Sequence, residues 1–115
     1  MLDDLILVFK AFSHPLREQI LKVLLKNSGL TSLEVAERVG VVEPAIKHHL
    51  NVLIRAGLVK KRSELNGENM KYVWRYSIDV DRAVRLLDDV ISQISGLKDE
   101  IERVIMISSL TVSYT

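Results

Sequence analysis

Residues 30–57 contain two short helical patterns separated by a brief break, and this arrangement limits the fold more than any other feature. Apolar residues recur at helical spacing in both patterns. The first pattern stops at Gly40 and the second restarts at Pro44. Glycine is common just after a helix, and proline is common in the first turn of the next one. Two helices joined this tightly are typical of a helix-turn-helix, whose second helix is free to enter the major groove of DNA.

Each helix of this pair has an expected cap and an expected buried side. Thr31 or Ser32 caps the first helix, and Glu34 is placed to complete a capping box with Thr31. Gly57 is well placed to end the second helix. The residues expected to face the core are Leu33, Val35, Ala36 and Val39 on the first helix and Ile46, Leu50, Leu53 and Ile54 on the second.

After Gly57 the apolar period changes from that of a helix to that of a strand. Residues 58–65 and 68–78 flank Asn66-Gly67, a strong hairpin signal, and together predict a two-stranded wing. One face of the returning strand carries Met70, Tyr72, Trp74 and Tyr76, and the other carries Lys71, Val73 and Arg75. An aromatic stripe of this kind can stack on nucleic-acid bases. We expect it instead to pack against its own domain.

Helical patterns also flank this central unit. One helix ends near Ser13. A second covers residues 16–26 after a start signal at residues 13–15, where Ser13 or His14 can cap and Pro15 fits the first turn. A long last helix runs from Asp79 or Asp81 to about Ser108. The apolar stripe of the last helix is too broad for one small domain to cover, so a second subunit is expected to cover the remainder. The predicted interface consists of Leu5, Phe9, Val84, Leu87, Ile91, Ile94, Ile101 and Ile105.

The whole chain of 115 residues is therefore expected to form one domain, mainly α-helical with a small β-hairpin. The helix-turn-helix occupies residues 31–57 and the wing residues 58–78, while the helices at 1–13 and 80–108 mediate dimerisation. The net charge of the chain is +1, but the charges are unevenly distributed. Residues 43–76 have a net charge of +4, and residues 79–103 have a net charge of −3. A basic central section beside an acidic last helix indicates a polyanionic partner for the first only.

Several classes of protein and site are not expected from this composition. The chain contains no cysteine, so disulfides and thiolate metal sites are excluded. The first residues carry Asp3 and Asp4 without a basic leader, and every uncharged apolar run is too short to span a bilayer. We therefore expect a cytoplasmic protein. No glycine-rich phosphate loop or nucleophile–base spacing predicts an enzyme, and no cofactor is predicted.

An ordered set of motifs resembles the ArsR-type winged-helix regulators, and the resemblance covers about residues 5–107. It begins with AFSHPLREQIL at residues 11–21 and continues with LEVAE at 33–37, AIKHHLNVL at 45–53, AGLV at 56–59 and YSI at 76–78. The resemblance implies a homodimer built from the first and last helices, with two winged helix-turn-helix units that bind a palindromic operator.

The chain departs from that family pattern in two respects. Many relatives bind metals through cysteines, or through aspartate and histidine on the last helix, whereas this chain has no cysteine and its last helix has no histidine. No metal is therefore predicted. Val42 also replaces the usual hydroxyl cap of the second helix, and Glu43 places a carboxylate near the groove, where it must avoid phosphate or meet a cytosine amino group.

The side chains left outside the predicted core are the candidates for DNA contact. Lysine donates to guanine, and asparagine pairs with adenine in the major groove, whereas cations beside the groove contact phosphates. His49 is expected to pack within its own domain through a hydrogen-bonded ring, because neighbours on a helix diverge too far to chelate one ion with His48. The predicted base contacts are Glu43, Ala45, Lys47, His48 and Asn51, and the predicted backbone contacts are Thr31, Ser32, Arg55, Lys60, Arg62, Lys71 and Arg75.

These observations favour a sequence-specific, homodimeric transcriptional regulator that binds double-stranded DNA and represses by occluding its operator. The alternative is a winged-helix module that keeps the fold, does not read DNA, and binds proteins within a larger transcription or chromatin assembly. Glu43 on the second helix is the feature that favours the alternative.

Overall fold

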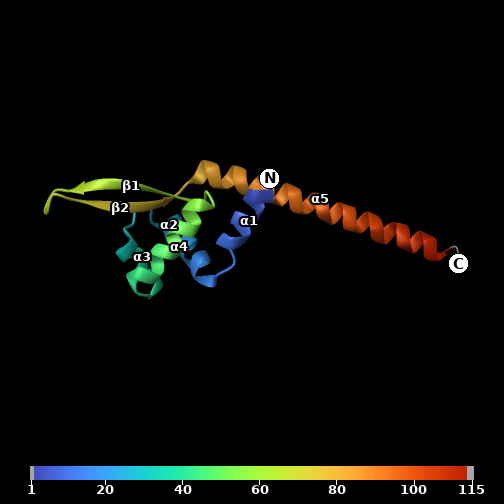
Figure 1. Ribbon diagram of the computed structural model, residues 1–115, viewed down its shortest axis with the longest axis horizontal. Helices are drawn as coiled ribbons and strands as arrows, with labels where there is room; N and C mark the ends of the chain where they lie inside the picture. The colour runs from blue at the N-terminus through green and yellow to red at the C-terminus, as the bar shows by residue number, and fades with distance from the viewer. Residues whose placement is uncertain (1, 114–115) are drawn as a thin grey trace.

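The computed structural model describes the backbone of residues 2–113 and the side chains of residues 4–110. Figure 1 shows a compact body from which a hairpin projects on one side and a long helix on the other. The principal extents are 79 × 26 × 22 Å. The predicted helices and hairpin are confirmed, in the order α1 Leu2–Ala11, α2 Pro15–Lys26, α3 Ser32–Val39, α4 Glu43–Arg55, β1 Val59–Asn66, β2 Lys71–Ile78 and α5 Val80–Ser113.

The helix ends follow the local signals of the sequence. His14 caps α2, and its Nδ1 accepts a hydrogen bond of 3.1 Å from the amide of Leu16. Thr31 caps α3 in a capping box with Glu34, as predicted. Gly40 ends α3 with a φ of 85°, a left-handed conformation that glycine adopts without steric strain. The turn between α3 and α4 is therefore fixed by its own residues.

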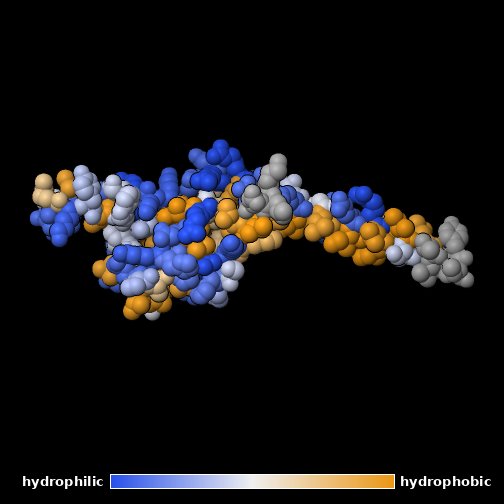
Figure 2. All heavy atoms as spheres, viewed as in Figure 1, coloured by the Kyte–Doolittle hydropathy of each residue, from blue (hydrophilic) through white to orange (hydrophobic). Residues whose placement is uncertain are grey.

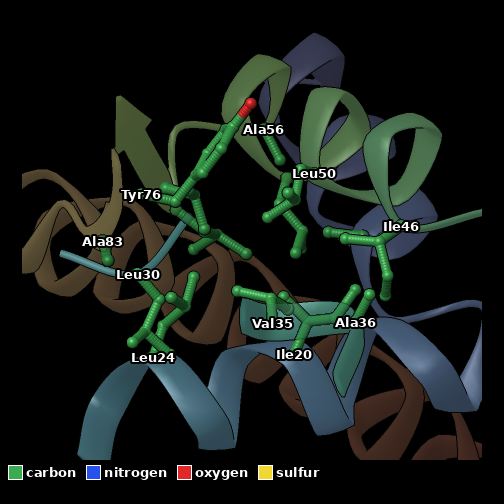
Figure 3. Close-up of a cluster of buried hydrophobic side chains, with 14 residues drawn as sticks. Ile20, Leu24, Leu30, Val35, Ala36, Ile46, Leu50, Ala56, Tyr76 and Ala83 are labelled. Atoms are coloured by element: carbon green, nitrogen blue, oxygen red, sulfur yellow. The ribbon is translucent and has the colours of Figure 1, made fainter. Parts of the chain in front are cut away.

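The hydrophobic core lies where α2, α3, α4 and the base of the wing meet (Figure 3). Ile20, Ile46, Leu50 and Leu53 are completely buried in it. Leu33 does not join them, and the prediction that it faces the core is wrong, since it is 52% exposed. The body packs against α3 through the adjacent residues Val35 and Ala36, so Leu33 is carried to the outer side of the helix.

The two strands of the wing pair antiparallel, with Val59 opposite Ile78 at the base and Asn66 opposite Lys71 at the tip. The prediction of a two-residue turn at Asn66-Gly67 is wrong. Asn66 stays in β1, and its carbonyl accepts a hydrogen bond of 2.8 Å from the amide of Met70. Met70 has a φ of 56°, whereas Gly67 has no positive φ. The wing therefore closes through a four-residue loop, and β2 starts at Lys71 rather than at residue 68.

Helix α5 leaves the body soon after it begins. Ala83 and Val90 are buried, and α1 packs against this first part of the helix, whereas every side chain from 91 to 110 is exposed. Figure 2 shows the resulting apolar band along one side of the projecting helix. Among the residues that the structure describes, no helix is long and apolar enough to cross a membrane. The predicted interface residues on α5 are partly or largely exposed, and they include Val84, Ile91, Ile94, Ile101 and Ile105.

Candidate nucleic-acid interface

Helix α4 presents a polar face to solvent because its apolar face is anchored in the core. Ile46, Leu50 and Leu53 are completely buried and fix the rotation of the helix about its axis. With this rotation, the predicted contact residues on the opposite side are exposed, namely Ala45, Lys47, His48, Asn51 and Arg55. An anchored helix with a free polar face is the arrangement that major-groove recognition requires.

Glu43 is half-buried in the first turn of α4. A carboxylate at this end of a helix interacts favourably with the helix dipole. Its Oε1 lies 3.1 Å from Nζ of Lys47, one turn further along the helix. The ion pair balances the negative charge that makes Glu43 unusual in a groove. Lys47 remains exposed, and its predicted contact with a guanine acceptor stays a prediction.

The start of α3 is occupied by its own capping residues. Oγ1 of Thr31 accepts a hydrogen bond of 3.2 Å from the amide of Glu34, and Oε1 of Glu34 accepts one of 3.1 Å from the amide of Thr31. The hydrogen bonds from Thr31 lower the pKa of Glu34, and nearby Arg75 and Arg38 lower it further. Thr31 therefore acts first as a cap, while the half-buried Ser32 follows it at the start of the helix.

The register of the hairpin sorts the cations of the wing onto its two faces. Directly opposed residues of an antiparallel pair share a face, so Arg62 opposite Arg75 defines one basic face. Lys61 lies on the other face opposite Tyr76, and its Nζ is 4.6 Å from the ring centroid of Trp74. The predicted backbone contacts on the wing all lie on the basic face, namely Lys60, Arg62, Lys71 and Arg75.

The aromatic stripe of β2 only partly follows the prediction that it packs against the body. Tyr76 is buried, and burial raises the pKa of its hydroxyl. Tyr72 is 71% exposed and Trp74 is 49% exposed, so the prediction is wrong for these two residues. The wing projects beyond the helices (Figure 1), and among the described residues its base, with Val59 and Tyr76, is the part that belongs to the core.

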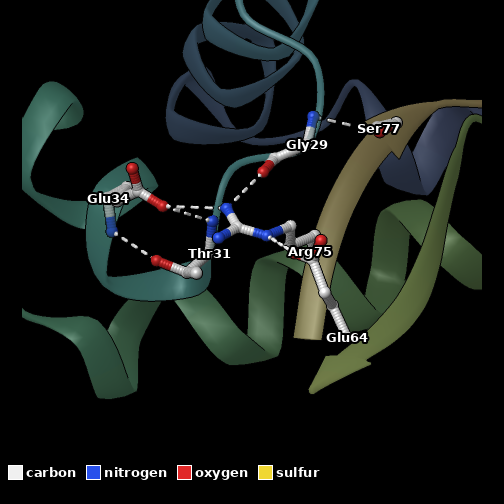
Figure 4. Close-up of polar contacts among 6 residues, drawn as sticks. All are labelled: Gly29, Thr31, Glu34, Glu64, Arg75 and Ser77. Carbon is white, nitrogen blue, oxygen red and sulfur yellow. Dashed lines mark hydrogen bonds and ion pairs between the residues drawn. The ribbon is translucent and has the colours of Figure 1, made fainter. Parts of the chain in front are cut away.

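Arg75 joins three parts of the interface (Figure 4). Its Nη1 donates a hydrogen bond of 2.9 Å to the carbonyl of Gly29 and lies 3.6 Å from Oε1 of Glu34, while its Nε bonds to Glu64. The guanidinium thus links β1, β2 and the segment that leads into α3. The structure favours a positioning role for Arg75, and its predicted contact with phosphate stays a prediction.

We expect Arg75→Ala to lower the free energy of unfolding by about 1–2 kcal/mol, because charge-assisted hydrogen bonds to the carbonyl and the two carboxylates are removed together. Urea unfolding measures the change. Lys71→Ala is the matched control, since it removes an exposed cation from the same face of the wing. Equal destabilisation by the two substitutions would contradict the positioning role.

His49 packs within its own domain, as predicted. Its Nδ1 accepts a hydrogen bond of 3.1 Å from Nε of Arg17, and the ring of His14 lies 4.6 Å away between centroids. Burial lowers the pKa of His49, and the positive charges of His14, Arg17 and His48 add to this effect. Across the described residues, no three potential ligand residues gather in a way that could hold a metal ion. Sequence reasoning did not foresee Arg17 as the partner of His49, because the contact joins α2 to α4.

We expect the free energy of unfolding to fall as the pH falls below about 6.5, because the unfolded chain then binds a proton that folded His49 resists. The fall ends once the pH is below the lowered pKa. Urea unfolding near pH 7.5 and near pH 5.5 measures this slope. His49→Gln should remove most of the difference in unfolding free energy between the two pH values. His48→Gln alters an exposed neighbour and should leave most of that difference in place. An unchanged slope in the first variant would rule out His49 as its source.

Comparison with known proteins agrees with this geometry. A family model described as winged helix-turn-helix DNA-binding matches residues 14–60. An uncharacterised HTH-type transcriptional regulator of Methanocaldococcus jannaschii, MJ1325, is 33% identical over 94 residues, which is 82% of this chain and 90% of that protein. The transcriptional repressor SdpR of Bacillus subtilis is 44% identical over 52 residues, which is 45% of this chain and 57% of that protein.

Solved structures share the fold. The winged helix-turn-helix domain of Mb0332 from Mycobacterium bovis, described as homodimeric and as a possible ArsR-family regulator, superposes with a TM-score of 0.60 at 25% identity and covers 85% of each chain. An ArsR-family regulator, RHA00566, superposes with a TM-score of 0.63 at 19% identity, covering 86% of this chain and 94% of the other. The fold is therefore the one seen in ArsR-family proteins, and the chain belongs to the winged helix-turn-helix transcriptional regulators.

Proposed function

We propose that the protein is a homodimeric repressor that binds a palindromic operator and blocks access to it. The observation that carries this proposal is the polar face of α4, held outward by a buried apolar face and flanked by the basic wing. The name of SdpR supports repression, and the homodimeric description of Mb0332 supports self-association. Dimers of this kind present two α4 helices to successive major grooves.

In this proposal α4 makes the base contacts, and the wing, Arg55 and the start of α3 make the phosphate contacts. Lys47, His48 and Asn51 lie on the exposed face of α4 and supply the donors that distinguish base pairs, with Glu43 and Ala45 beside them. The basic face of the wing and Arg55 contact phosphates and set the register of the protein on the duplex. Ser32 and Thr31 approach phosphate at the start of α3, where the positive end of the helix dipole favours an anion.

Glu43 on α4 is the feature that favours the alternative of a protein-docking module. In the free protein its charge is offset by the ion pair with Lys47, so the carboxylate alone does not argue against DNA. Selection of bound duplexes from a random DNA pool by the purified protein separates the two functions. A symmetric consensus with two half-sites supports the proposed function. If the protein enriches no sequence and does not bind random duplex even in dilute salt, the proposed function is contradicted.

We expect Lys47→Ala to remove about 1–3 kcal/mol of discrimination at one base pair of each half-site, because its ammonium contacts a base edge. Lys71→Ala should weaken binding to operator and to random duplex alike and reduce the salt dependence, because its ammonium contacts phosphate. Fluorescence anisotropy titrations of both duplexes at several salt concentrations measure the two effects. Uniform weakening by Lys47→Ala would show that this residue does not contact a base.

A further inference from the structure

A hollow lies where the starts of α3 and α4 meet strand β2. Its volume is about 310 Å³, and it is lined by Ser32 from α3, Lys47 from α4, and Val73 and Trp74 from β2. Ser32 and Lys47 are both predicted DNA contacts. The hollow is therefore continuous with the proposed interface.

Two large apolar side chains of this hollow are not covered by the protein itself. Leu33 is 52% exposed and Trp74 is 49% exposed, although the sequence predicts that both pack against their own domain. Exposed apolar side chains that gather beside a binding surface commonly mark a contact with the partner. The hollow thus offers an apolar wall within an otherwise polar interface.

Positive groups surround this apolar wall. Nζ of Lys61 lies 4.6 Å from the ring centroid of Trp74, and Lys61 itself is exposed. Helix α3 begins at Ser32, so the positive end of its dipole lies beside the hollow. A fitting occupant therefore combines a small apolar ring with negative charge on both sides of it. Each deoxyribose of a DNA strand has this property, because a phosphate is attached on either side of the sugar.

We propose that the hollow holds one deoxyribose of the operator backbone, with the ring of Trp74 packed against the sugar and with Lys61 and Ser32 at the two flanking phosphates. The inference rests on the proposed function and adds a contact of different chemistry to it. Trp74 and Lys61 lie on the face of the wing opposite the basic face of Arg62 and Arg75. The sugar is the same in every nucleotide, so this contact adds affinity without sequence preference.

Tryptophan fluorescence tests the contact directly, because Trp74 is the only tryptophan of the chain. The natural chain is titrated with unlabelled consensus duplex and with random duplex, and parallel anisotropy titrations of labelled duplexes report binding. We expect the emission of Trp74 to change with the same midpoint as the anisotropy for both duplexes.

Substitutions separate an apolar contact from an electrostatic one. Trp74→Ala should weaken binding to both duplexes about tenfold without altering the salt dependence, since it removes apolar burial and no charge. Trp74→Phe keeps an aromatic ring and should retain most of the affinity. Lys61→Ala should reduce the salt slope by about 1. Tyr72→Ala is the matched control, because Tyr72 is an exposed aromatic residue of the same strand face outside the hollow, and it should bind as the natural chain does.

The outcomes distinguish this inference from the proposed function. Full binding by anisotropy without a change in tryptophan emission overturns the inference and leaves the proposed function intact. Loss of affinity for the consensus duplex alone in Trp74→Ala also overturns it, because the ring would then contact a base and not a sugar. Absence of binding to either duplex overturns the proposed function and the inference together.

Discussion

Leu50→Ala is expected to lower the free energy of unfolding by about 3–5 kcal/mol. Leu50 is completely buried, and its side chain points from α4 toward the helices beneath it (Figure 3). Truncation removes apolar burial and leaves a cavity that surrounding helices fill only in part. Because domains of this size are stable by about 5–15 kcal/mol, the loss is a large fraction of the total. Urea unfolding at fixed protein concentration measures it.

Leu33→Ala is the matched control for this prediction, because it makes the same change on the neighbouring helix at a side chain that is 52% exposed. Its effect on the free energy of unfolding should stay within about 0.5 kcal/mol. Comparable destabilisation by the two substitutions would contradict the assignment of Leu50 to the core and of Leu33 to the outer side of α3. The comparison also tests the rotation of α4, on which the exposure of Lys47 depends.

The helices could be predicted from the sequence because their ends depend on adjacent residues. The capping box of Thr31 and Glu34 and the left-handed Gly40 are local devices, and each forms as the sequence indicates. The polar side of α4 was predictable for the same reason, since the spacing of Ile46, Leu50 and Leu53 defines its buried side. The family itself was indicated by the resemblance of the ordered motifs and not by these short-range rules.

The wing was predicted less well because its details depend on longer-range contacts. The Asn-Gly pair indicated the right place for the turn, yet the loop is longer. In it, the side-chain oxygens of Asn66 and Asn69 accept hydrogen bonds from the amides of Glu68 and Lys71. Trp74 is exposed because the wing extends past the helices, which alternation along one strand does not reveal. The contacts of Arg75 join residues that are 11 and 46 positions apart, so no local pattern distinguishes this residue from the other cations.

The long last helix was predicted, but its separation from the body was not. Periodicity showed an apolar stripe along α5, and only the fold shows that α1 meets just its first part. An apolar groove between α2 and the start of α5 was not predicted, because the residues that line it come from four separate parts of the chain. They include Phe12, Leu25, Leu58 and Val84. A sequence shows which faces are apolar, whereas the fold decides which of them remain uncovered.

The combined substitution Ile94→Asp with Ile101→Asp is expected to produce a monomer and to weaken operator binding by about 100-fold or more. Ile94 and Ile101 are 45% and 52% exposed in the single chain and lie in the middle of the α5 stripe. Carboxylates at these positions make the buried pairing of two helices unfavourable. A dimer gains affinity because one bound half-site raises the effective concentration of the other unit, and linked sites of this kind gain about 10²–10⁴ in avidity. Light scattering and anisotropy titration measure the two effects.

Ser92→Asp with Ser95→Asp supplies the matched control, because it adds the same charge to α5 outside the apolar stripe. This variant should remain dimeric and bind operator as the natural chain does. The monomeric variant should still bind a single half-site, since α4 and the wing do not contact the altered residues and keep their own anchors in the core. Loss of half-site binding would mean that the α5 stripe supports the DNA-binding unit itself. Retention of a dimer would mean that the copies associate through another surface.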